Sequence, residues 1–162
     1  RYLDKKNVKL YTETGVYTQD ELKAHYEIKL EKYCKVLNIE VETMLEMISK
    51  DILPAAFAYM GAVAKSAADL KAVVPQAKAS SQTALLKKLD GLAADLSKRT
   101  DELRKKHLAA KEASDLMERA RAYSDSVLPA MAQTRAVADE IEPLLGENYK
   151  PFPCYEDLLF RL

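Results

Sequence analysis

A regular apolar stripe in the first half of the chain limits the possible folds more than any other feature. Large apolar or aromatic residues recur in steps of four, four and three, at Leu22, Tyr26, Leu30, Tyr33, Leu37, Val41, Met44, Ile48 and Ile52. Eleven residues therefore complete three turns, which is the period of a nearly straight α-helix. Beyond Pro54 the stripe continues, with one polar slip, through Ala55, Tyr59, Val63, Ser66, Leu70 and Val74. It predicts one long helix that bends near Leu53, because proline removes a backbone hydrogen bond.

Local signals predict where the helices begin and end. Thr18 and Glu21 have the spacing of a capping box, in which each side chain binds the other residue's backbone amide at a helix start. Gly15 suits the left-handed cap of a short helix within 1–15. Pro75 is expected to end the first arm, and Gly146 closes the last helix. The start of the second arm is predicted at Ser80 or Ser81, either of which could act as its N-cap.

The second arm carries a heptad seam. Its members are Leu85, Leu89, Leu92, Leu96, Leu103, Ala110, Ala113, Met117, Ala120 and Val127. Arg99 and Lys106 interrupt the seam, so it does not predict a clean coiled coil. A Leu-Pro-Ala step occurs at 53–55 and again at 128–130. If the arms pair antiparallel, the two proline kinks are expected to lie near each other.

The fold predicted from these patterns is all-α: a long kinked antiparallel helical hairpin or bundle with a short extended C-terminal segment. Only four Gly and six Pro occur, too few turn residues for a fold built of many hairpins. We expect a short helix and turn over 1–17, and a helical hairpin or bundle over 18–147 with arms 18–74 and 81–146. A Pro-rich tail over 148–162 should dock through its apolar end.

Composition narrows the possible partners. Lys plus Arg equals Asp plus Glu at 25 each, so nucleic acid is not an expected partner. No apolar run reaches transmembrane length, so no membrane partner is expected. Cys34 and Cys154 are isolated thiols, which favours a reducing, cytoplasmic location. The chain starts at Arg1 rather than Met, which suggests a piece of a longer protein.

The chemically versatile side chains have structural interpretations. His25 lies beside the apolar stripe without a second histidine at ligand spacing, and His107 is expected on a solvated face. The basic run 98–106 contains interleaved acids and no aromatics, unlike a nucleic-acid site. Lysines surround the three glutamates that could suggest a carboxylate cluster, Glu21, Glu27 and Glu31. No phosphate-binding loop, nucleophile elbow or zinc motif occurs. We therefore predict no catalytic, cofactor-binding or metal-binding residue in this chain.

Both ends of the chain resemble the C-terminal region of type III glutamine synthetases. The first stretch combines KNVKLY at 6–11, GVYT at 15–18 and ELKAHYEI at 21–28, and continues through LEKYCKVLNIE at 30–40 to DILPA at 51–55. The second stretch is PFPCYEDLLF at 151–160. The middle, about 60–125, matches only in being long, alanine-rich and charged.

The resemblance implies a parent glutamate–ammonia ligase that uses ATP with Mg or Mn in nitrogen assimilation and assembles as a ring. Its catalytic residues would lie in a core upstream of Arg1, with 1–17 and the tail as the contacts to that core. The chain itself would be non-catalytic and serve oligomer assembly or an accessory surface. The alternative is a stand-alone helical coiled-coil interaction module, which Arg99 and Lys106 disfavour. A metal-dependent bundle enzyme would need a Glu-x-x-His pair, and neither histidine has a Glu three positions before it.

Overall fold

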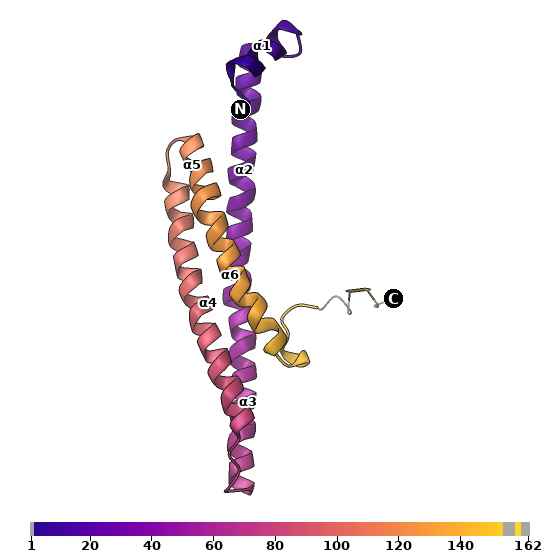
Figure 1. The fold of residues 1–162 in the computed structure, drawn as a ribbon, viewed down its shortest axis with the longest axis vertical. Helices are drawn as coiled ribbons and strands as arrows, with labels where there is room; N and C mark the ends of the chain where they lie inside the picture. Colours follow the sequence, from indigo (N-terminus) through magenta and orange to yellow (C-terminus); the bar gives the residue numbers. More distant parts are fainter. Residues whose placement is uncertain (1, 154–157, 160–162) are drawn as a thin grey trace.

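The regular elements in the described part of the chain are all helical, which confirms the all-α prediction (Figure 1). The structure, a computed structural model, describes residues 2–153 and 158–159. The first arm consists of α1 (Lys5–Glu13), α2 (Gln19–Met47), the π-helical turn η1 (Ile48–Ile52) and α3 (Leu53–Val73). The remaining elements are α4 (Ser80–Glu112), α5 (Leu116–Ala122), the π-helical turn η2 (Tyr123–Val127), α6 (Leu128–Ile141) and the short 3₁₀ turns η3 (Glu142–Leu144) and η4 (Glu147–Tyr149).

The first arm forms as the sequence predicts. The backbone amide of Thr18 donates to the Glu21 carboxylate at 2.8 Å, and the Glu21 amide donates to the Thr18 hydroxyl at 3.2 Å, so the capping box starts α2. Gly15 takes the left-handed conformation, with φ of 68°, at the end of α1. The first arm stays helical from α2 into α3 through Pro54. The wider π turn η1 ends at Ile52, two residues before the proline. A π turn of this kind accommodates a residue that cannot donate to the helical ladder.

The second arm is not one helix, and the prediction of a continuous arm over 81–146 is wrong. Helix α4 ends at Glu112, and Ala113 adopts an extended conformation with ψ of 123°. The side chain of Asp115 then accepts from the Glu118 amide at 2.9 Å and caps a new helix, α5. The chain reverses here, so α5 and α6 run back along α4 (Figure 1). The result is a bundle of three long helical segments.

The predicted serine cap is also wrong. Ser80 is already the first helical residue of α4, and the position before it is Ala79, a non-glycine residue in the left-handed conformation with φ of 47°. Neither Ser80 nor Ser81 caps the helix with its side chain. The Thr83 hydroxyl instead donates to the Ala79 carbonyl at 2.9 Å, one turn into the helix.

The two Leu-Pro-Ala segments have the same local structure, but they do not pack against each other. A π-helical turn precedes Pro129, as one precedes Pro54. Because the chain reverses after α4, α6 runs in the same direction as the first arm, and the two kinks lie at different levels. Ile48 of η1 packs in one core cluster, whereas Tyr123 and Val127 of η2 pack in the other. The predicted proximity of the kinks is therefore wrong.

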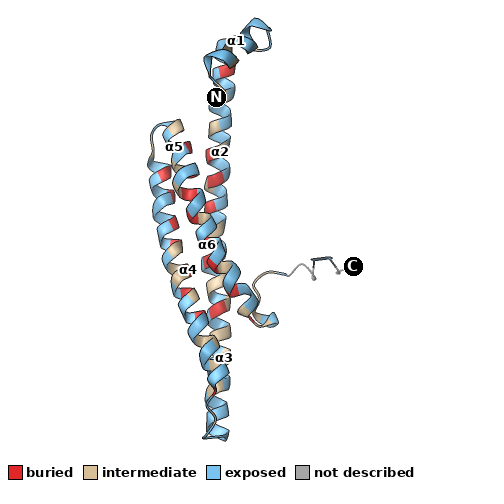
Figure 2. Cartoon of the chain, viewed as in Figure 1, coloured by how far each residue is buried: buried red, intermediate tan, exposed pale blue. Residues whose placement is uncertain are grey.

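Buried residues lie along the length of the bundle (Figure 2) and form two clusters. The upper cluster joins α2, α4, α5, η2 and the start of α6 through Cys34, Leu37, Val41, Leu45, Leu103, Ala110, Ala120, Tyr123, Val127 and Ala130. The lower cluster joins η1, α3, the first half of α4, the second half of α6 and the segment after it, through Ile48, Ala56, Leu89, Leu96, Val137, Ile141 and Leu145. Met44 packs against both clusters. The upper end of α2 extends beyond α5, and α1 folds over it (Figure 1).

Within the described part of the chain, no helix is long and apolar enough to cross a bilayer. The predicted docking of the tail falls mainly on 154–157 and 160–162, which lie outside the described residues, as does Cys154. Of the tail that is described, Pro151 and Phe152 lie against the bundle at the mouth of a groove.

Candidate functional site

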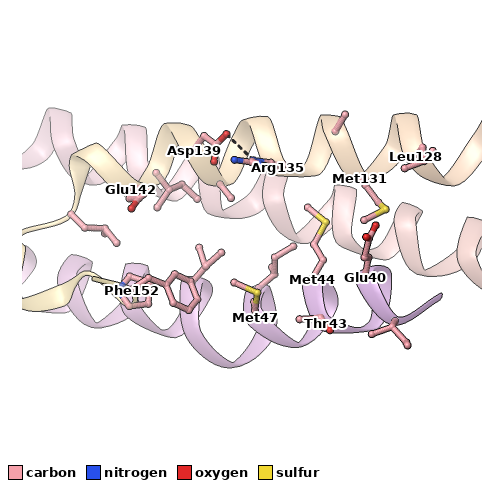
Figure 3. A pocket seen from close by; sticks show the side chains of 18 residues that line it. Glu40, Thr43, Met44, Met47, Leu128, Met131, Arg135, Asp139, Glu142 and Phe152 are labelled. Carbon is pink, nitrogen blue, oxygen red and sulfur yellow. Dashed lines mark ion pairs between the residues drawn. The ribbon is translucent and has the colours of Figure 1, made fainter. Parts of the chain in front are cut away.

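An apolar groove of about 720 Å³ opens between α2 and α6 (Figure 3). Its walls are formed mainly by the apolar side chains of Met44, Met47, Ile48, Ile52, Leu128, Met131, Ile141 and Leu145. Pro151 and Phe152 also line the groove. Methionine is flexible and polarisable, so a wall rich in thioethers can adapt to different apolar partners. The groove is suited to contact with an apolar side chain or helix.

The rim of the groove is polar. Arg135 and Asp139 pair across one turn of α6, with Nε and Oδ2 3.4 Å apart, and both side chains are largely exposed. Glu40 and Thr43 lie on the opposite edge, along α2, and Glu142 lies beyond Asp139. A hydrophobic floor with a polar rim is the usual arrangement at protein–protein contacts.

An exposed apolar stripe on α2 continues the surface of the groove. We call it the α2 stripe; it consists of Ile28, Val36, Ile39 and Met47, whose side chains are 60%, 42%, 62% and 37% exposed. Their spacing of eight, three and eight residues keeps them on one side of a helix. Ile39 and Met47 also line the groove, so the stripe adjoins the groove at these two residues.

His107 is buried, and the prediction that it lies on a solvated face is wrong. Its side chain is 6% exposed and packs against Tyr123, whose hydroxyl lies 3.5 Å from Nδ1. Nε2 lies 3.7 Å from Glu42 Oε1, too far for a hydrogen bond. The Nζ atom of Lys111 donates a hydrogen bond to that same Glu42 oxygen, at 3.0 Å. The histidine is three positions before Ala110 and four after Leu103, both core residues, so helical periodicity turns it inward.

Burial sets the protonation of this histidine. Loss of solvation lowers the pKa of His107 below its ordinary value, and the charge of Lys111 lowers it further, while Glu42 opposes both. The neutral imidazole is therefore the form that the folded chain prefers. The same carboxylate has a lowered pKa, first because Lys111 donates a hydrogen bond to it.

We expect the free energy of unfolding to fall as the pH drops from about 6.5, the ordinary pKa of histidine, toward the lowered pKa of His107. In that window the unfolded chain takes up a proton that the folded chain resists, so acid favours unfolding. One proton limits the slope to about 1.4 kcal/mol per pH unit. Urea titrations between pH 8 and pH 5 measure it.

Two matched variants show whether His107, rather than another group, causes this dependence of the free energy of unfolding on pH. His107→Leu is expected to flatten this part of the profile, whereas His25→Gln, which leaves the buried imidazole in place, is expected to retain it. A profile that His107→Leu does not change would contradict the assignment.

The other chemically versatile side chains make local structural contacts. The ring of His25 packs against Tyr17, with centroids 4.9 Å apart. Exposed ion pairs within α2 join Glu27 to Lys23 at 3.9 Å and Glu31 to Lys35 at 3.6 Å. In the basic run 98–106, Arg99 pairs with Asp95 at 2.9 Å. Among the described residues, no three His, Cys, Asp or Glu side chains gather to hold a metal ion.

The described residues form a helical bundle with an apolar groove between α2 and α6. Residues 1–71 match the model of the family described as glutamine synthetase C-terminal domain. Over 99% of its length the chain is 32% identical to a glutamine synthetase of Butyrivibrio fibrisolvens, and it covers 23% of that protein. It is 26% identical, over 96% of its length, to a type-3 glutamine synthetase of Dictyostelium discoideum and covers 22% of it. A glutamine synthetase of Bacteroides fragilis is 22% identical over 98% of the chain, which again covers 22% of the relative.

The chain is similar to glutamine synthetases along nearly its whole length, and its first 71 residues match the C-terminal domain of that family. It spans less than a quarter of the length of these relatives. The family resemblance seen at the two ends of the sequence is thereby confirmed, and the alignments extend it across the middle of the chain as well.

Proposed function

We propose that this chain is the non-catalytic C-terminal region of a type III glutamine synthetase and that it supplies contacts between subunits. The similarity to a type-3 enzyme along nearly the whole chain supports the type. The parent protein would ligate ammonia to glutamate with ATP and Mg or Mn in the cytoplasm. Residues 1–17 and the tail 148–162 would be the segments through which the bundle, 18–147, joins the catalytic core.

The apolar groove and the adjoining α2 stripe support the assembly role. Large exposed apolar areas are uncommon on monomers and mark interaction sites. The occupant that we propose is another subunit of the same protein, because an obligate homo-oligomeric contact is more apolar than a transient one. The charged rim, with Arg135, Asp139, Glu40 and Glu142, would fix the orientation of that contact.

The alternative, a stand-alone coiled-coil module, has less support. Leu89, Leu96, Leu103 and Ala110 keep a strict seven-residue spacing on α4, as such a module would need. All four are buried against the chain's own helices. The heptad seam is therefore occupied within the bundle and is not available to a second coiled-coil strand.

Sedimentation velocity over a range of protein concentrations tests the assembly role. The chain is expected to self-associate through its apolar surface, and the double variant Ile39→Glu with Met47→Glu is expected to shift it toward the monomer. Two buried carboxylates would have to lose their hydration at the contact, which costs several kcal/mol. The control is Leu108→Glu, the same kind of change at an exposed position of α4. A strictly monomeric chain at high concentration, or equal effects of both sets of variants, would contradict the proposal.

A further inference from the structure

A second, smaller cavity lies beside α2, where it meets α4, α5 and η2. Its volume is about 360 Å³, and it is lined by Cys34, Lys35, Asn38, Ile39, Lys111, Arg119 and Tyr123. Lys35 and Asn38 come from α2, Lys111 from the last turn of α4 and Arg119 from α5. Three of its seven lining side chains carry positive charge, and none carries negative charge. A wall of this composition favours an anion.

Arg119 is held in place by the reversal of the chain. Its Nε and Nη2 both donate to the carbonyl oxygen of Ala113, at 3.1 and 2.7 Å. Ala113 is the residue that follows the end of α4, so this pair of hydrogen bonds fixes the guanidinium at the turn. Among the described residues no carboxylate pairs with Arg119, whereas planar guanidinium groups are the preferred partners of phosphate. Burial raises the pKa of the Cys34 thiol and that of the Tyr123 hydroxyl, and the positive charge of Arg119 acts against both rises.

The two lysines have carboxylate partners, but both partners lie outside the cavity lining. Lys35 pairs with Glu31 at 3.6 Å, and Lys111 pairs with Glu42 at 3.0 Å. Both pairs are about half exposed or more, so each lysine can turn from one partner to another at little cost. Asn38 adds an amide that can donate to an oxygen.

We propose that this cavity binds a small phosphate anion, held by Arg119, Lys35 and Lys111. The shared chemistry is a dianionic oxyanion, which can come from free phosphate or from the phosphate group of a small phosphomonoester. A carboxylate with one charge would bind more weakly, because the cations outnumber it. This inference is independent of the proposed assembly role, since only Ile39 lines both the cavity and the groove.

Isothermal titration calorimetry of the chain with inorganic phosphate, glycerol phosphate and acetate tests the site. Phosphate is expected to bind saturably, with acetate at least tenfold weaker, and added NaCl is expected to weaken the binding. Tighter binding of glycerol phosphate than of phosphate would identify a phosphomonoester as the ligand, and the reverse order would identify the free ion.

Neutral substitutions locate the binding site. Lys35→Gln is expected to weaken phosphate binding about threefold to tenfold, and Lys35→Gln with Lys111→Gln is expected to weaken it by at least a further factor of three. The matched control is Lys105→Gln, which removes the same charge from an exposed position of α4. Circular dichroism verifies that each variant stays folded. No saturable binding of phosphate, or equal weakening by Lys105→Gln, would overturn the proposal.

Discussion

Replacing Leu103 with alanine is expected to lower the free energy of unfolding of the chain by about 3 kcal/mol, within the 2–5 kcal/mol typical of buried Leu→Ala changes. Leu103 is 0% exposed and belongs to the upper core cluster, with Val41 of α2 and Val127 of η2. It therefore lies where all three helical segments meet. Truncation removes apolar contacts and leaves a cavity that rigid helices fill poorly. Urea denaturation followed by circular dichroism measures the loss.

The matched control lies five residues further along the same helix. Leu108 is 56% exposed, and Leu108→Ala is expected to change the free energy of unfolding by no more than about 0.5 kcal/mol. Helix propensity changes equally in the two variants, so the difference between them reports burial alone. If Leu103→Ala cost less than about 1 kcal/mol, or if both variants cost the same, the described core would be wrong.

Much of the fold could be predicted from the sequence because its signals are local and periodic. The capping box of Thr18 and Glu21 depends on residues three positions apart, and it forms as predicted. The inward face of α4 follows from the seven-residue spacing of Leu89, Leu96 and Leu103, all fully buried. A helix that continues through Pro54 was predicted because the apolar stripe keeps its phase there.

The errors in the prediction have two physical causes. The reversal after Glu112 is marked locally by the capping residue Asp115, within a seam whose apolar spacing carries on through the break. Once continuity was assumed, the two kinks were expected to meet. The burial of His107 was missed because its charged neighbours suggested a solvated face, although its spacing from Leu103 and Ala110 indicated the core.

The groove and the anion cavity could not be predicted, because each forms between segments far apart in the sequence. The groove requires α6 to return beside α2, and the cavity requires Arg119 to return beside Lys35. Both depend on the reversal at Ala113. Once that turn is known, the exposed positions of α2 and the basic residues of α4 and α5 define the two surfaces.

The second large effect concerns activity. We expect the purified chain to form no glutamine from glutamate, ammonia and ATP. Several of its titratable side chains make structural contacts: His107 is buried in the core, Glu42 pairs with Lys111, and Glu21 caps a helix. Such a reaction needs convergent polar groups and a metal in one pocket. The groove between α2 and α6 is instead predominantly apolar.

The most direct test of the account is a side-by-side assay of ATP-dependent glutamine formation by this chain and by the full-length protein that carries it. Both are produced in a host that lacks its own glutamine synthetase, so that no host enzyme contributes. We expect the full-length protein to form glutamine, and the chain alone to show only the background rate measured without enzyme. Glutamine formation above that background by the chain alone would contradict the account.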